Sequence, residues 1–80
     1  MTRVRLIGAQ GCHLCHEALE VLESVRSRIP FDLEVVLIDG DSGLEGEYRE
    51  QIPVVLLDGV KHFKFVVPPD ELEKRLKSIT

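Results

Sequence analysis

Cysteine and aromatic residues are scarce in this chain, and the low cysteine count excludes one class of small protein. The 80 residues include two Cys, no Trp, one Tyr and three Phe. A small secreted domain held together by disulfides carries four or more cysteines, so that class of scaffold is excluded. A bond between cysteines only three positions apart would also close a very short loop and add little stability. Chemistry therefore explains the pair Cys12 and Cys15 better than structural cross-linking does.

Long apolar runs and clusters of positive charge are missing as well. No stretch approaches the roughly 18 apolar residues that a membrane span requires. The pair Leu6-Ile7, which follows Arg3 and Arg5, is too short for the apolar core of a signal peptide. The formal net charge is −4, which favours neither nucleic acid phosphates nor anionic lipid as partners. We therefore expect a cytoplasmic protein with no membrane partner and no nucleic acid partner.

The composition that is present is that of a folded domain. Hydrophobic residues make up 44% of the chain and charged residues 30%, with only 6 Gly and 4 Pro. These proportions differ from those of disordered or low-complexity segments. A chain of this length buries one core, so we expect residues 1–80 to form a single, monomeric domain.

The apolar pattern of the first half predicts a strand, a helix and a second strand. Residues 2–8 are apolar enough for a short buried strand. From residue 12 to Ile29, apolar residues recur at steps of three and four, and Pro30 disfavours a helical residue before it. Residues 31–39 alternate and then become continuously apolar from Val35, which is typical of a central strand covered on both faces.

The second half predicts a helix, a hairpin and a last helix. The pair Asp58-Gly59 is typical of a tight two-residue turn between two strands. The expected elements are a weak helix over 44–51, strands over 54–57 and 60–66, and a helix that opens at Pro68-Pro69-Asp70. A strand-helix-strand crossover implies a parallel pair, and the hairpin adds antiparallel strands. The sequence therefore predicts an α/β fold of order β-α-β-α-β-β-α, with a four-stranded mixed sheet and helices on both faces.

The position of the two cysteines favours redox chemistry. Cys12 lies where the first loop meets the helix, and there the free N–H groups and the helix dipole stabilise a thiolate. The neighbouring His13 would add positive charge or a hydrogen bond when protonated. Cys15 lies one turn further on, near enough to close a disulfide, and continues the apolar stripe of the helix. We therefore expect Cys12 to attack a substrate disulfide and Cys15, the less exposed thiol, to resolve the mixed disulfide.

The same motif also allows two other interpretations, a zinc site and a covalently attached haem. A C-x-x-C pair forms half of a zinc site, but four ligands are needed, and His13, His16 and His62 are the other soft candidates. The run from Cys12 to His16 also fits C-x-x-C-H, the signature of covalent haem attachment. A haem would have to take His62 as its distal ligand, because the sole methionine is Met1.

A strand, then GCHLC opening a helix, then Ile52-Pro53 before a later strand resembles the thioredoxin superfamily, specifically its glutaredoxin-like branch. The resemblance implies a thioredoxin-like fold and thiol–disulfide exchange by Cys12 and Cys15, with no tightly bound cofactor. It also implies that Pro53 is cis and lies beside the dithiol. The backbone N–H and C=O of Ile52 would then pair with an extended substrate.

The chain departs from that branch where glutathione would be held. Gly8-Ala9-Gln10 stand where a lysine is common, and Val66-Val67 stand where a Gly-Gly pair is usual, so that only Asp70 matches. The resemblance thus implies glutathione as a reductant only weakly. The expected partner is a disulfide-containing protein or a low-molecular-weight thiol. A non-catalytic module for redox sensing or partner binding is the alternative function.

Overall fold

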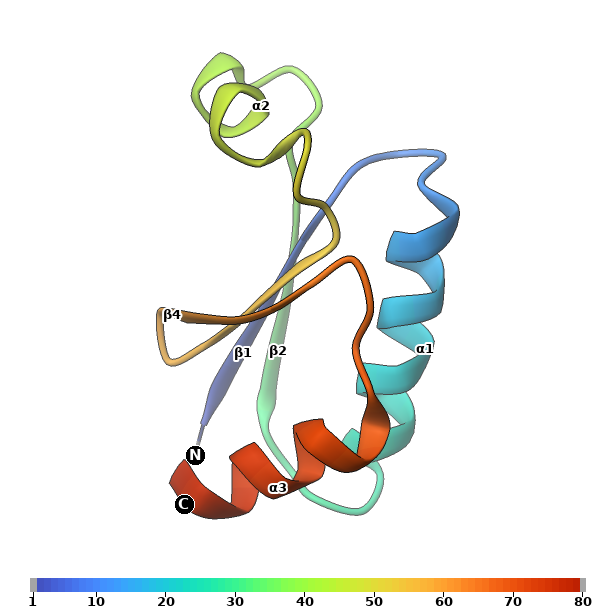
Figure 1. The fold of residues 1–80 in the computed structure, drawn as a ribbon, viewed down its shortest axis with the longest axis vertical. Coiled ribbons are helices and arrows are strands. Elements are labelled where there is room, and N and C mark those ends of the chain that lie inside the picture. The colour runs from blue at the N-terminus through green and yellow to red at the C-terminus, as the bar shows by residue number, and fades with distance from the viewer. Residues whose placement is uncertain (1, 80) are drawn as a thin grey trace.

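Seven elements follow one another along residues 2–79, the part of the chain that this computed structural model describes (Figure 1). They are β1 (Arg3–Gly8), α1 (His13–Arg26), β2 (Asp32–Leu37), α2 (Ser42–Tyr48), β3 (Val54–Leu57), β4 (Val60–Lys64) and α3 (Pro69–Ile79). This order is the one that the sequence predicts. No helix among these residues has both the length and the apolar character needed to cross a bilayer.

The four strands form one mixed sheet in the order β2-β1-β3-β4. β1 runs parallel to β2 and antiparallel to β3, and β3 pairs antiparallel with β4 across the turn at Asp58 and Gly59. The parallel pair comes from the crossover through α1, and the antiparallel pair comes from the hairpin. The α/β class and the mixed sheet are therefore confirmed.

The expectation that the second strand is central is wrong, because β2 lies at the edge of the sheet with β1 as its strand neighbour. Val35 and Leu37 are each 45% exposed. The residues of β2 alternate between the two faces of the sheet, so its apolar side chains contribute to both. Leu33 packs against the core under α1 and α3, whereas Val36 packs against the core on the opposite face.

Helices lie on both faces of the sheet but cover them unequally (Figure 1). α1 and α3 share one face, where the larger core contains Leu22, Val25, Leu72 and Leu76. α2 covers the other face only at one end, above a smaller core around Ile7 and the neighbouring residues of β3. The larger core therefore holds α1 in place, and α1 carries the dithiol at its beginning.

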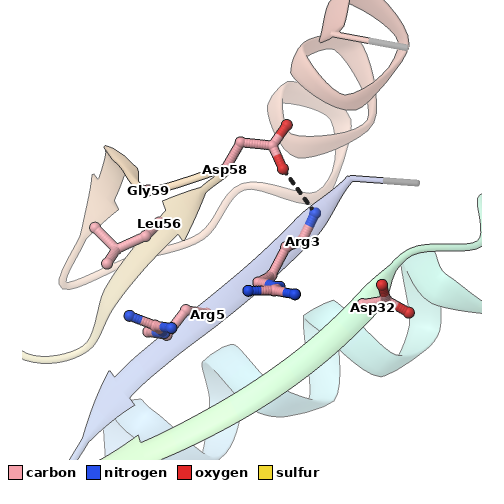
Figure 2. A pocket seen from close by; sticks show the side chains of 6 residues that line it. All are labelled: Arg3, Arg5, Asp32, Leu56, Asp58 and Gly59. Carbon is pink, nitrogen blue, oxygen red and sulfur yellow. Dashed lines mark hydrogen bonds between the residues drawn. The ribbon is translucent and has the colours of Figure 1, made fainter.

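The uncovered part of the second face is a hollow of about 450 Å³ (Figure 2). Arg3 and Arg5 project into it from β1 (Figure 2). The Arg3 backbone N–H donates to Asp58 Oδ1 at 2.9 Å, and Arg5 Nε donates to Glu34 Oε1 at 2.6 Å. Charges of both signs border the hollow, and it lies toward the opposite end of β1 from the cysteines.

Three of the helix and strand ends that differ from the prediction are fixed by local hydrogen bonds or backbone angles. α1 ends at Arg26 rather than Ile29, since the N–H groups of Arg28 and Ile29 both donate to Val25 in a closing turn. α2 begins earlier than expected because the Asp41 side chain caps it by accepting from the Leu44 N–H at 3.1 Å. β4 ends at Lys64, since Phe65 adopts a φ of 69° that no strand continues.

Candidate active site

Cys12 is the residue that caps the beginning of α1. Its backbone is extended, with φ −82° and ψ 109°, and its Sγ accepts a hydrogen bond from the Cys15 N–H at 3.2 Å. Gly11, with φ 72°, makes the turn into this position, and the Cys12 N–H donates to the Ala9 carbonyl at 3.3 Å. The sulfur thus takes the place of the side-chain oxygen in an ordinary helix cap, where a negative charge is stabilised.

Cys15 lies one turn further along and is joined to Cys12 by a disulfide, with their Cα atoms 5.2 Å apart. That Cα distance is within the usual range for a disulfide. Cys15 is only 8% exposed, whereas Cys12 is half-buried. The expected difference in exposure between the two thiols is confirmed.

Gly8, at the end of β1, supplies the space that Cys15 occupies. A Cβ placed on Gly8 would lie 3.1 Å from both the Cβ and the Sγ of Cys15. Such a separation is shorter than an ordinary van der Waals contact between carbon atoms. From the sequence, Gly8 was expected only to end a strand. A glycine four residues before a C-x-x-C motif could have indicated that a cysteine packs against it.

The loop between β1 and α1 is tied to the end of β2. The Gln10 N–H donates to Asp39 Oδ2 at 2.9 Å, and the Ile38 N–H donates to the Gly8 carbonyl at 2.9 Å. These two bonds fix the segment that leads into Cys12. Asp39 is a positioning residue that the sequence did not reveal, because nothing local marks a side chain that reaches across to another loop.

The peptide bond between Ile52 and Pro53 is cis, as the resemblance implied. Pro53 is buried, and its carbonyl accepts a hydrogen bond from the Phe65 N–H at 2.8 Å. The Ile52 N–H donates to the Tyr48 carbonyl at 3.1 Å. A substrate that paired with both backbone groups of Ile52 would therefore first have to displace this bond.

The histidines of α1 turn toward acids on their own helix. His13 Nε2 lies 3.0 Å from Glu17 Oε2, and His16 Nε2 lies 3.0 Å from Glu20 Oε1. The His13 side chain is 85% exposed. Across residues 2–79, no three side chains of His, Cys, Asp or Glu come together in a way that could hold a metal ion. The structure thus joins the two cysteines to each other and not to the histidines.

Comparison with known families gives a match over nearly the whole chain. Residues 3–77 match the model of the family described as "Glutaredoxin-like domain (DUF836)". An uncharacterized protein of Mycobacterium tuberculosis is 35% identical over 65 residues, which cover 75% of this chain and 67% of that protein. An uncharacterized protein of Mycobacterium bovis matches to the same extent.

Solved structures give the same picture of the fold. A structural genomics target protein from X. campestris has a TM-score of 0.80 at 27% identity and covers 94% of this chain and 96% of its own. A protein from Nitrosomonas europaea has a TM-score of 0.79 at 26% identity, covering 92% and 89%. A mutant thioredoxin from Halobacterium salinarum has a TM-score of 0.71 at 20% identity, covering 96% and 73%, and shares the fold. The thioredoxin-like fold expected from the sequence is therefore confirmed.

Proposed function

We propose that this chain, which belongs to the family of glutaredoxin-like domains, is a thiol–disulfide oxidoreductase that acts through Cys12 and Cys15. One observation carries the proposal. Cys12 Sγ caps α1 and accepts the Cys15 N–H, within reach of a second and more buried sulfur. A sulfur at this place is stabilised as a thiolate, and the thiolate is the nucleophile of disulfide exchange.

The exchange starts from the reduced pair. The Cys12 thiolate attacks one sulfur of the substrate disulfide, forms a mixed disulfide with it and releases the other substrate sulfur as a thiolate. The Cys15 thiolate then attacks Cys12 Sγ and displaces the second substrate sulfur. The substrate gains two electrons, and the protein is left with the Cys12–Cys15 bond. Run in reverse, the same steps oxidise a dithiol.

The cis-Pro53 segment is proposed as the place where the substrate chain lies. Ile52 is half-buried and immediately precedes the cis bond. We assign its carbonyl to accept from an extended substrate, and its N–H to join only after leaving Tyr48. His13, largely exposed and paired with Glu17, is proposed as a further contact at the edge of the dithiol.

The partners that this chemistry requires are a disulfide-containing protein and a thiol that restores the reduced pair. Glutathione or another low-molecular-weight thiol would serve as the reductant without any tightly bound cofactor. We place the protein in the cytoplasm, where the thiol pool keeps such pairs reduced, and expect it to act as a monomer.

Three forms of the protein test the proposal: the wild type, Cys12→Ser and Cys15→Ser. Each is reduced and mixed with a small uncharged disulfide, bis(2-hydroxyethyl) disulfide, and the products are followed by mass spectrometry. The wild type should reduce the disulfide, and Cys12→Ser should not. Cys15→Ser should accumulate a stable mixed disulfide on Cys12, because no second thiol releases it. Equal exchange by wild type and Cys12→Ser would contradict the proposal.

The alternative, a redox-sensing or partner-binding module, is supported by two exposed apolar side chains that border one groove, Leu14 of the C-x-x-C motif and Phe65. That module would bind a partner in one redox state and would turn over no disulfide. An absence of exchange in the wild type, together with redox-dependent partner binding, would favour it.

A further inference from the structure

An apolar groove runs along the beginning of α1, against the segment that joins β4 to α3. Its volume is about 110 Å³, which is room for one aliphatic side chain. Three large apolar side chains that border it are substantially exposed: Leu14 at 45%, Phe65 at 44% and Val66 at 65%. Its more buried part is formed by Ala18, Val21 and Val67. Exposed apolar side chains gathered in one place, rather than scattered singly, mark interaction sites.

Two residues of the groove, Leu14 and Phe65, connect it to the candidate active site. Leu14 stands between the two cysteines, and Phe65 donates its N–H to the carbonyl of cis-Pro53 at 2.8 Å. The segment after β4 passes beside α1 on its way to α3 (Figure 1). A ligand chain attached to Cys12 and lying along the Pro53 segment would therefore place a neighbouring side chain at this groove.

The charges around the groove favour an uncharged occupant. Glu17 lines it, and Lys64 lies beside it with Nζ 5.7 Å from the centre of the Phe65 ring. These two charges have opposite signs, so together they add no net charge beside the groove, and the other lining residues are apolar. Glutathione carries two carboxylates. They would lose hydration at this groove, and its apolar lining and balanced charges would not offset the cost.

We infer that this groove selects its substrate: a protein disulfide in which an apolar side chain adjoins the reacting cysteine, in preference to glutathione disulfide. The inference rests on the proposed function, because the groove acts only while Cys12 exchanges disulfides. The covalent steps are unchanged. Cys12 forms the mixed disulfide, Cys15 releases it, and the protein is oxidised as the substrate is reduced. The apolar side chain adds binding at the step in which the mixed disulfide forms.

Two peptide disulfides of equal length and charge test the inference. One has Leu next to the cysteine and the other has Ser at that position; glutathione disulfide and bis(2-hydroxyethyl) disulfide complete the set. The second-order rate constant for oxidation of the reduced wild type should be about tenfold higher with the Leu peptide than with the Ser peptide, because one aliphatic side chain is buried. Glutathione disulfide should react more slowly than the Leu peptide.

Val66→Ser is the test variant and Val60→Ser the matched control. Both valines are exposed, at 65% and 60%, and Val60 lies at the beginning of β4, outside the groove. The ratio of these rate constants between the Leu and Ser peptides should fall severalfold in Val66→Ser and should keep its wild-type value in Val60→Ser. Phe65→Asn provides a second test, because asparagine tolerates the positive φ of this position. Its ratio should fall as well.

The outcomes separate the two proposals. If the wild type reacts with none of the four disulfides, the proposed function fails. If it reduces bis(2-hydroxyethyl) disulfide but treats the Leu and Ser peptides alike, only the groove inference is overturned. An equal fall of the ratio in Val60→Ser would also overturn it, because the effect would not belong to the groove.

Discussion

The two ends of α1 differ in what their contacts do. At the first end, Cys12 Sγ caps the helix, and the next turn brings Cys15 so near to Gly8 that a side chain at Gly8 would lie 3.1 Å from Cys15 Sγ. At the other end, Arg28 Nη2 pairs with Glu73 of α3 at 2.8 Å, and Arg26 Nε donates to the Phe31 carbonyl at 2.8 Å. The first end carries the two cysteines, whereas the second end binds the helix to α3 and to the loop that follows α1.

This difference shows how a small domain can carry reactive chemistry on a helix that is otherwise part of its core. Between the two ends, Leu22 and Val25 are fully buried in the larger core. Changes at the first end should therefore alter thiol reactivity and the fit of Cys15. Changes at the second end should alter only the stability of the fold.

The largest effect is expected from Gly8→Ala at the first end. The added methyl group would lie 3.1 Å from the Cβ and Sγ of Cys15, so Cys15 or the end of β1 must move. Forcing an extra carbon into a packed site costs about 1–3 kcal/mol. Chemical denaturation of the oxidised protein should show a loss of that size, and alkylation of the reduced protein should show a more accessible Cys15.

Gly46→Ala is the matched control for this change. Gly46 lies in α2, and a Cβ added there would meet nothing within 4 Å. Alanine also favours a helix over glycine by up to about 1 kcal/mol, so the control should be neutral or stabilising. If Gly8→Ala lost no more free energy of unfolding than Gly46→Ala, the contact between Gly8 and Cys15 would not be tight.

A smaller effect is expected from Glu73→Gln at the second end. The hydrogen bond from Arg28 lowers the pKa of the Glu73 carboxyl below its ordinary value. A carboxyl whose pKa is lower in the folded state stabilises the fold above its unfolded pKa of about 4.3, and this contribution is lost as the pH falls through the folded pKa. Thermal unfolding should give Glu73→Gln a slightly lower Tm than wild type at pH 7, with the difference disappearing under more acid conditions.

The matched control here is Glu50→Gln, which removes an exposed carboxylate that follows α2. Its Tm should stay near that of the wild type at both pH values, and neither glutamine variant should change the exchange rate. A slower exchange in Glu73→Gln would show that the two ends of α1 are coupled, which contradicts the comparison.

The order of the elements could be predicted from the sequence because each one has its own local signal. The three- and four-residue steps after Cys12, the Asp58-Gly59 turn and Pro68-Pro69 all act over a few residues. The asymmetry of Cys12 and Cys15 followed from the same helical stripe, and the resemblance supplied the cis bond at Pro53, which the structure contains.

The features that were missed depend on contacts between distant parts of the chain. β2 was expected in the centre of the sheet, because its apolar run does not reveal how many neighbours it has. Gly8 of β1 leaves room for Cys15 of α1. The Asp39 side chain, which follows β2, accepts the Gln10 N–H. Neither contact leaves a periodic pattern in the sequence.

The beginning of α1 should make Cys12 the nucleophile, and the pH dependence of alkylation measures this. The reduced wild-type protein is alkylated with iodoacetamide at a series of pH values, and the modified cysteine is identified by peptide mass spectrometry. We expect Cys12 to react first, with a pKa clearly below the ordinary thiol value of about 8.5. Alkylation of Cys15 at the same rate, or a Cys12 pKa at or above that ordinary value, would show that the helix cap does not activate Cys12.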